Sequence, residues 1–283
     1  MHVKFWGVRG SIPVAGPSTA RYGGNTSCVE VTLSDGRELI LDAGTGIHAL
    51  GRARPQQTGR ADILLTHLHL DHIHGLMFFA PLFDPRCRTV VWGPAAADGP
   101  LRQRLARYIS APLSPIEMRE LPGSVSFETC PSAEWDIGPA RVEATLVNHR
   151  GPTFGYRICE GDTSLCYLPD HEPALGTHLA DADPDWISGF GLAQGASLLI
   201  HDCQYLDEDY PDHLGWGHSA VSDTLRFALR SGAERIALFH HDPLHDDAEL
   251  DRLGEAAATR WAQLGGAEGA LEMAAEQQAI VLD

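Results

Sequence analysis

Short apolar runs recur along the chain, separated by segments rich in glycine, proline, aspartate and serine. Some runs alternate apolar and polar residues, as in strands with one buried face, at 3–6, 29–33, 125–128 and 140–147, and 38–41 reads as a strand after a hairpin turn at 34–37. Others read as more fully buried strands, at 63–65, 89–93, 197–200 and 235–239, and 153–158 and 164–168 suggest a hairpin. Apolar residues at helical spacing predict helices at 101–109, 218–231 and 246–264. The pattern predicts an α/β protein with two sheets and helices on their outer faces.

Several of these predicted strands are followed directly by residues that can bind a metal ion. The runs that end near residues 65, 147, 168, 200 and 239 are followed by His67, His149, Asp170, His201-Asp202 and His240-His241. Such repetition is improbable for scattered surface histidines. We therefore expect the carboxyl ends of strands from both sheets to converge on one site.

The densest group of candidate ligands is the stretch from Thr66 to Gly75, which contains His67, His69, Asp71 and His72. Three imidazoles and one carboxylate within six residues can direct several neutral nitrogens and an oxygen into a small volume. A loop of ordinary surface histidines is the simpler alternative, but histidine is scarce and this clustering is dense. The stretch therefore predicts a metal site with room for two ions.

The pattern His67-x-His69-x-Asp71-His72 resembles the signature of the metallo-β-lactamase superfamily. The resemblance extends over nearly the whole chain, and it implies a four-layer αββα sandwich with two metal ions between the sheets. It also implies the ligands: His67, His69 and His149 for one ion, Asp71, His72 and His240 for the other, and Asp170 as a bridge. His240 is preferred to His241 because it follows the strand directly. Zinc is the default ion, and manganese and iron are alternatives.

Within the superfamily, the chain is more similar to the branch that contains RNase Z and phosphodiesterases. Ile200-His201-Asp202 and Gly217-His218-Ser219 resemble two motifs of that branch, although Asp202 replaces a glutamate and Ala220 a threonine. The resemblance implies that His218, oriented by Asp202, acts as a proton donor or oxyanion stabiliser. The glycine-rich N-terminal stretches resemble those of a subgroup of uncharacterised phosphodiesterase-like members.

Three further sets of residues are candidates for supporting roles. Arg9 and Asn25, in the glycine-rich N-terminal loops, are predicted to contact a substrate phosphate. Asp42 either orients a metal-bound histidine or serves as a turn or helix cap. The cluster of Arg102, Arg104 and Arg107 is either a solvated helix face or a rim that attracts an anionic substrate.

Composition narrows the choice of partners. The 283 residues include 21 Lys and Arg against 38 Asp and Glu, a formal net charge of -17 that disfavours binding of nucleic acid. No linker divides the chain, which predicts a single domain over residues 1–283. The absence of an apolar leader or membrane span predicts a cytoplasmic protein, and a homodimer is compatible with the sequence.

These expectations favour a metal-dependent phosphodiesterase that cleaves a small or cyclic nucleotide-like phosphodiester through a hydroxide bridging the two ions. A thioester or lactone hydrolase of the glyoxalase II type and a tRNA-processing endonuclease of the RNase Z type are alternative enzymes. A metal-stabilised binding protein or sensor, or an iron-bearing redox protein, is the alternative outside hydrolysis.

Overall fold

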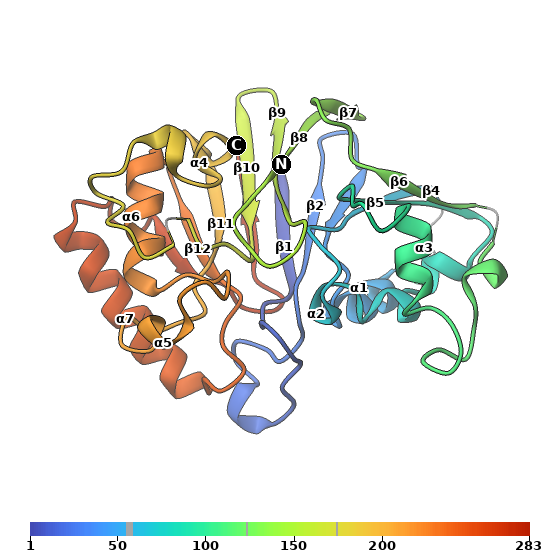
Figure 1. The fold of residues 1–283 in the computed structure, drawn as a ribbon, viewed down its shortest axis with the longest axis horizontal. Coiled ribbons are helices and arrows are strands. Elements are labelled where there is room, and N and C mark those ends of the chain that lie inside the picture. Colours follow the sequence, from blue (N-terminus) through green and yellow to red (C-terminus); the bar gives the residue numbers. More distant parts are fainter. Residues whose placement is uncertain (55–58, 123, 174) are drawn as a thin grey trace.

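Two seven-stranded sheets pack face to face and carry helices on their outer faces (Figure 1). The computed structural model describes residues 1–54, 59–122, 124–173 and 175–283. The first sheet has the strand order β14-β1-β2-β3-β4-β5-β6. Its strands are β1 His2–Gly7, β2 Cys28–Thr32, β3 Glu38–Leu41, β4 Gly59–Leu64, β5 Cys87–Gly93, β6 Val125–Thr129 and β14 Ala279–Val281.

The second sheet has the order β13-β12-β11-β10-β9-β8-β7 and repeats the plan of the first. Its strands are β7 Trp135–Ile137, β8 Ala140–Leu146, β9 Phe154–Glu160, β10 Thr163–Leu168, β11 Leu198–Asp202, β12 Ile236–Phe239 and β13 Leu271–Met273. In each sheet one half is antiparallel and the other parallel, and the parallel halves are β3 to β6 and β10 to β13. Parallel strands leave their carboxyl ends at one edge, which is where α/β proteins place functional loops.

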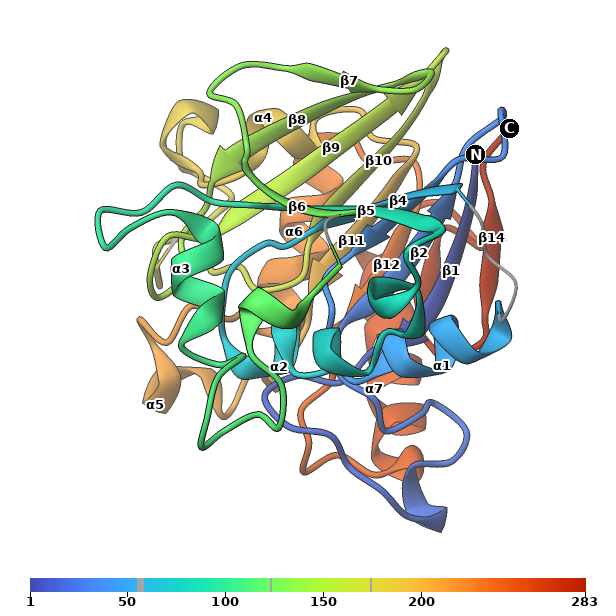
Figure 2. The same ribbon diagram turned by 90° about the vertical axis from the view of Figure 1, so that its right-hand side faces the viewer.

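Helices cover both outer faces of this pair of sheets. The first sheet is covered by α1 Gly46–Ala53, α2 Leu70–Ile73 and α3 Leu101–Ala106, which the turned view shows together (Figure 2). The second sheet carries α4 Phe190–Ala193, α6 Val221–Ser231 and α7 Asp247–Gln263, and α5 Tyr210–His213 lies in the loop before α6. Short 3₁₀ turns occupy Pro17–Thr19, Leu76–Phe78, Ala80–Phe83, Met118–Glu120 and Pro184–Trp186.

Three apolar layers hold the sandwich together. The central layer joins the facing sides of the sheets, where Phe5 of β1 lies 6.0 Å from Phe239 of β12 between ring centroids. The two outer layers join each sheet to its helices, with Trp261 of α7 buried on one side and Ile47 of α1 on the other. Burial on both faces accounts for the strongly apolar character of β10, β11 and β12.

The predicted αββα fold is confirmed, with local differences. Helix α6 begins at Val221 rather than at residue 218, because Ala220 is extended and the side chain of His218, which precedes it, bonds to Asp202. Strands β7, β13 and β14 were not predicted, since three residues are too few for a clear alternating pattern. No helix among the described residues has the length and apolar character needed to cross a membrane.

Candidate metal centre

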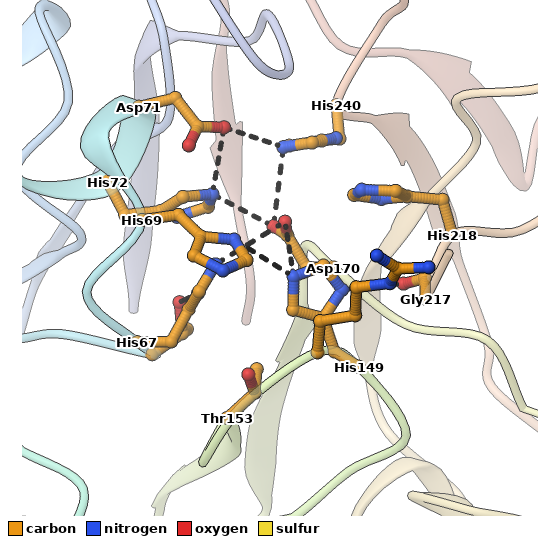
Figure 3. A network of polar contacts seen from close by, with 12 residues as sticks. His67, His69, Asp71, His72, His149, Thr153, Asp170, Gly217, His218 and His240 are labelled. Carbon is orange, nitrogen blue, oxygen red and sulfur yellow. Dashed lines mark hydrogen bonds and ion pairs between the residues drawn. The ribbon is translucent and has the colours of Figure 1, made fainter. Parts of the chain in front are cut away.

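Loops from both sheets bring the predicted ligand residues to one place (Figure 3). His67 and His69 lie in the loop after β4, and Asp71 and His72 lie in the short helix α2 that follows it. From the second sheet come His149, after β8, Asp170, after β10, and His240, after β12.

These side chains form two overlapping groups whose ligand atoms lie within 4.8 Å of one another. One group contains His67, His69, His149 and Asp170, and the other contains Asp71, His72, Asp170 and His240. Asp170 belongs to both: its Oδ2 lies 3.7 Å from His67 Nε2 and 3.6 Å from His149 Nε2, and its Oδ1 lies 3.0 Å from His72 Nε2. The structure thus brings together the seven residues that the resemblance named as ligands, with Asp170 between the two groups.

The chemistry of these donors fits divalent transition-metal ions. His67 Nε2 is buried and has no hydrogen-bond partner, and buried His72 Nε2 and Asp170 Oδ1 contact each other at 3.0 Å without an aligned hydrogen bond. Buried polar atoms without a partner are costly, and an ion is one explanation for such atoms where they converge. Imidazoles with carboxylates suit zinc, iron or manganese, whereas calcium and magnesium prefer oxygen ligands.

Each of four histidines hydrogen-bonds through one ring nitrogen and leaves the other for the centre. His72 Nδ1 bonds to Asp42 at 2.8 Å, which is the orienting contact proposed for Asp42. His149 Nδ1 donates to the Gly217 carbonyl at 2.8 Å, and His240 Nδ1 donates to Gln204 Oε1 at 3.0 Å. His67 Nδ1 lies 3.0 Å from Thr66 Oγ, which itself lies 3.0 Å from Asp42. Such contacts fix the ring orientation before an ion binds.

Burial and mutual charge set the protonation of the centre. Burial lowers the pKa of His67 well below its usual value and that of His149 to about 4. Burial would raise the pKa of Asp170, but His240, His72 and His67 outweigh it and hold the pKa well below the usual range. Burial lowers the pKa of His72, yet Asp170 and Asp71 raise it well above the usual value. The carboxylates therefore stay ionised at neutral pH, as metal ligands must.

His218 lies beside the second group and is held by Asp202. His218 Nδ1 bonds to Asp202 Oδ2 at 2.6 Å, and its ring stacks on His240 with centroids 5.0 Å apart. Asp202 also accepts bonds from the backbone N–H groups of Gln204 and Ser219. Burial lowers the pKa of His218, but the charge and hydrogen bond of Asp202 raise it to about 9. Asp202 thus favours the protonated form of His218 at the edge of the centre.

Three residues that were not predicted from the sequence orient the ligand residues or hold the loop beside them. The backbone N–H of Ser11 donates to Asp71 Oδ2 at 2.9 Å, and Gln204 orients His240. Buried Glu172 accepts bonds from Tyr210 Oη and from the backbone N–H groups at 215 and 217. It thereby fixes the loop that carries the carbonyl bonded to His149 and leads to His218. The sequence offered only a weak signal for Glu172, its position two residues after the predicted ligand Asp170, because glutamates near such residues are often exposed on the surface.

Arg9 and Asn25, which were predicted to contact a substrate phosphate, bond to other loops of the protein. Arg9 is 0% exposed, and its guanidinium donates to the backbone carbonyls of Gly23, Asp242 and His245. The Asn25 side chain donates to Glu276 at 3.0 Å. Both residues therefore bind other loops of the protein rather than facing the centre.

Four other histidines lie outside the two ligand groups. His241 is buried and donates through Nε2 to the Ala274 carbonyl at 2.8 Å. His171 is buried and lies 2.9 Å from His201 between ring nitrogens. His74 is exposed, with its ring 6.0 Å from that of Tyr108. These positions separate His240 from His241 in the way that the strand end suggested.

The arginine cluster divides into different roles. Arg102 donates to the Met118 carbonyl, and buried Arg104 donates to the Pro94 carbonyl. Arg107 is exposed and pairs with Asp98 at 2.8 Å. Arg104 and Arg107 also line a pocket that reaches His67 and His69. Two of the three arginines thus lie at the opening beside the centre.

Comparison with known proteins finds a matching family model, curated relatives and similar solved structures. A family model described as "Beta-lactamase superfamily domain" matches residues 37–241. Ribonuclease Z of Thermosynechococcus vestitus is 29% identical over 263 residues, which cover 88% of this chain and 59% of that protein. Human tRNase Z, short form, has a TM-score of 0.66 at 21% identity, with 100% of both chains covered. A diphosphatase from the PhnP family has a TM-score of 0.68 at 16% identity, covering 99% of this chain and 96% of the other.

Proposed function

The chain belongs to the beta-lactamase superfamily, and on that premise we propose that it is a metal-dependent phosphodiesterase that acts on a small or cyclic nucleotide-like phosphodiester. Two divalent ions would be held by His67, His69 and His149 on one side and by Asp71, His72 and His240 on the other, and Asp170 belongs to both groups. Zinc is the default. Ions bound there would supply Lewis acidity and a strong nucleophile at neutral pH.

The observation that carries the proposal is the position of His218. Its Nδ1 is occupied by Asp202, so the opposite nitrogen is free to act, and its ring lies against ligand His240. Cleavage of a phosphodiester expels an alkoxide, which needs a proton or a positive charge beside it. His218 is placed to donate that proton to the leaving oxygen, while Asp202 keeps the imidazole oriented.

A small substrate is favoured by the charge of the chain. Long nucleic acids are bound through many phosphates, each of which requires a cation, whereas this chain has a formal net charge of -17. Cleavage of precursor tRNA is the second candidate, and it is favoured by the relatives named ribonuclease Z. The chain spans 59% of the length of the first of those relatives and 84% of the second.

A substrate panel with metal analysis tests the proposal. We expect the purified protein to contain close to two transition-metal ions and to hydrolyse bis(p-nitrophenyl) phosphate or cyclic nucleotides. Chelation should abolish turnover, and added salt should change it little. Efficient, steeply salt-dependent cleavage of precursor tRNA would make that the function instead. Turnover of S-lactoylglutathione without phosphodiester cleavage, or full activity without metal, would refute the proposal.

A further inference from the structure

An open pocket of about 810 Å³ begins at His67 and His69 and extends away from the ligand groups. Its walls include the apolar side chains of Leu70, Ile73 and Leu113 and the short run of alanines at 95–97. Ligand pockets for drug-sized molecules span roughly 300–1,000 Å³. The pocket is therefore larger than a phosphate group alone would need, and much of its wall suits an apolar body.

The three arginines that line the pocket differ in their bonding partners. Three arginines line it in a chain whose net charge is -17, and Asp98 is the carboxylate among the lining residues. Arg107 pairs with Asp98, and Arg104 is turned to the Pro94 carbonyl. Among the described residues, no ion pair with a carboxylate is found for Arg150, which follows ligand His149 directly. Arg150 is thus the cation that remains for a substrate.

Arg150 is also held in position. Its Nε donates to the Gly215 carbonyl at 3.4 Å, and its Cζ lies 5.6 Å from the centre of the Trp216 ring. Trp216 is 51% exposed. A guanidinium placed over an aromatic ring loses less freedom when it binds an anion, and its fork of N–H groups matches a phosphate.

We propose that this pocket binds the organic substituent of the substrate, a flat aryl or nucleoside group, and that Arg150 binds the phosphate charge. The proposal rests on the proposed function and adds which substituent the enzyme selects and which residue selects for charge. Tyr108 supports a flat group, because its ring lines the pocket while its hydroxyl is anchored to the His74 carbonyl at 2.8 Å. Flat groups stack on tyrosine rings and on guanidinium planes.

Calorimetric binding tests the proposal without relying on turnover. The ligands are thymidine 5'-phosphate and inorganic phosphate, each titrated into the metal-loaded protein. Arg150→Gln removes the charge and Arg150→Lys retains it, while Ala95→Trp fills the pocket from an exposed lining position. Arg252→Gln is the matched control, since that side chain is 69% exposed on α7 and does not line the pocket. Hydrolysis of bis(p-nitrophenyl) phosphate is followed in parallel.

We expect thymidine 5'-phosphate to bind at least tenfold more tightly than phosphate. Arg150→Gln should weaken both ligands tenfold or more, Arg150→Lys should restore part of the loss, and Ala95→Trp should remove only the advantage of the nucleoside. Equal affinity for the two ligands, or an Arg150→Gln variant that matches Arg252→Gln, would overturn the inference. Nucleoside phosphate binding without any phosphodiester turnover would uphold the pocket and reject the proposed function. Phosphodiester turnover without tighter binding of the nucleoside phosphate would uphold the proposed function and reject the role of the pocket.

Discussion

Replacing Gly217 by alanine should disable the centre, whereas the same change at Gly215 should not. The two glycines share one loop, with φ of +91° at Gly217 and +80° at Gly215. A methyl group at 217 would lie 2.4 Å from His149 Nδ1, closer than the ordinary contact range of 3.4–4 Å. A methyl group at 215 meets no atom within 4 Å. The pair therefore separates backbone strain from displacement of a ligand.

The expected magnitudes follow from these distances. Placing alanine in a left-handed conformation costs roughly 1–2 kcal/mol at either position. At 217 the overlap adds about 1–3 kcal/mol, as overpacking does in a close-packed interior. Because His149 bonds to the 217 carbonyl at 2.8 Å, relief of the overlap must shift the imidazole or break that bond. A misplacement of about 1 Å at a reacting centre can cost ~10²-fold in rate.

The assay combines urea unfolding, metal content and turnover of bis(p-nitrophenyl) phosphate. Both variants should lose a similar small amount of stability from strain, and Gly217→Ala should lose somewhat more. Gly217→Ala should also turn over at least ~10²-fold more slowly or retain less metal, while Gly215→Ala stays within a few-fold of the wild type. Equal turnover and metal content in the two variants would show that the 217 carbonyl does not position His149.

Three further changes test separate parts of the site. His218→Ala should keep both ions yet slow hydrolysis by roughly 10²–10⁴-fold. The loss should be smaller for leaving groups that need no proton. Equal losses for p-nitrophenyl and alkyl esters would contradict the role of His218 as an acid. Glu172→Gln loses an acceptor for the 215–217 loop and should cost about 1–3 kcal/mol of unfolding free energy while weakening metal retention in a chelator competition. Tyr210→Phe, which removes a single donor to Glu172, is its control, and identical metal retention in the two variants would count against Glu172. His201 is fully buried, and burial lowers its pKa to about 4 from an ordinary value of 6.5. As pH falls from 6.5 to 4, the unfolded chain therefore binds a proton at His201 before the folded protein does, so the free energy of unfolding should drop by up to about 3 kcal/mol across that window. Urea unfolding measured at each pH should show a smaller drop for His201→Gln.

The ligand groups could be predicted because strand ends constrain where residues lie. A residue that directly follows a buried parallel strand must emerge at the sheet edge, whatever its side chain bonds to. His240 directly follows β12, Asp170 lies two residues after β10 and His67 three residues after β4, and all three reach the centre. Strand position also distinguished His240 from His241, since neighbouring residues leave a strand on opposite sides.

Substrate contacts could not be predicted in the same way, because loop side chains turn toward partners that are distant in sequence. Asn25 bonds to Glu276, which lies 251 residues away, and Arg9 bonds to the carbonyl of His245, 236 residues away. Neither partner has a sequence pattern that links it to the N-terminal loops. Arg150 could not be predicted either, because a single arginine after a histidine has no distinctive sequence pattern and the pocket around it is visible only in the folded protein.

The hydrogen bonds behind the ligands show why the motif at 67–72 is not a metal site by itself. His72 is oriented by Asp42, 30 residues away, His149 by the 217 carbonyl, 68 residues away, and His240 by Gln204, 36 residues away. Asp170, the carboxylate common to both groups, comes from the other sheet. Each of these three contacts joins loops of a single sheet, so the imidazoles are oriented within each sheet, whereas the ligands of each group come together only when the two sheets pack. Metal affinity should thus depend on the central apolar layer as well as on the ligands, since loosening the sheets would move the ligands at 67–72 away from His149, Asp170 and His240.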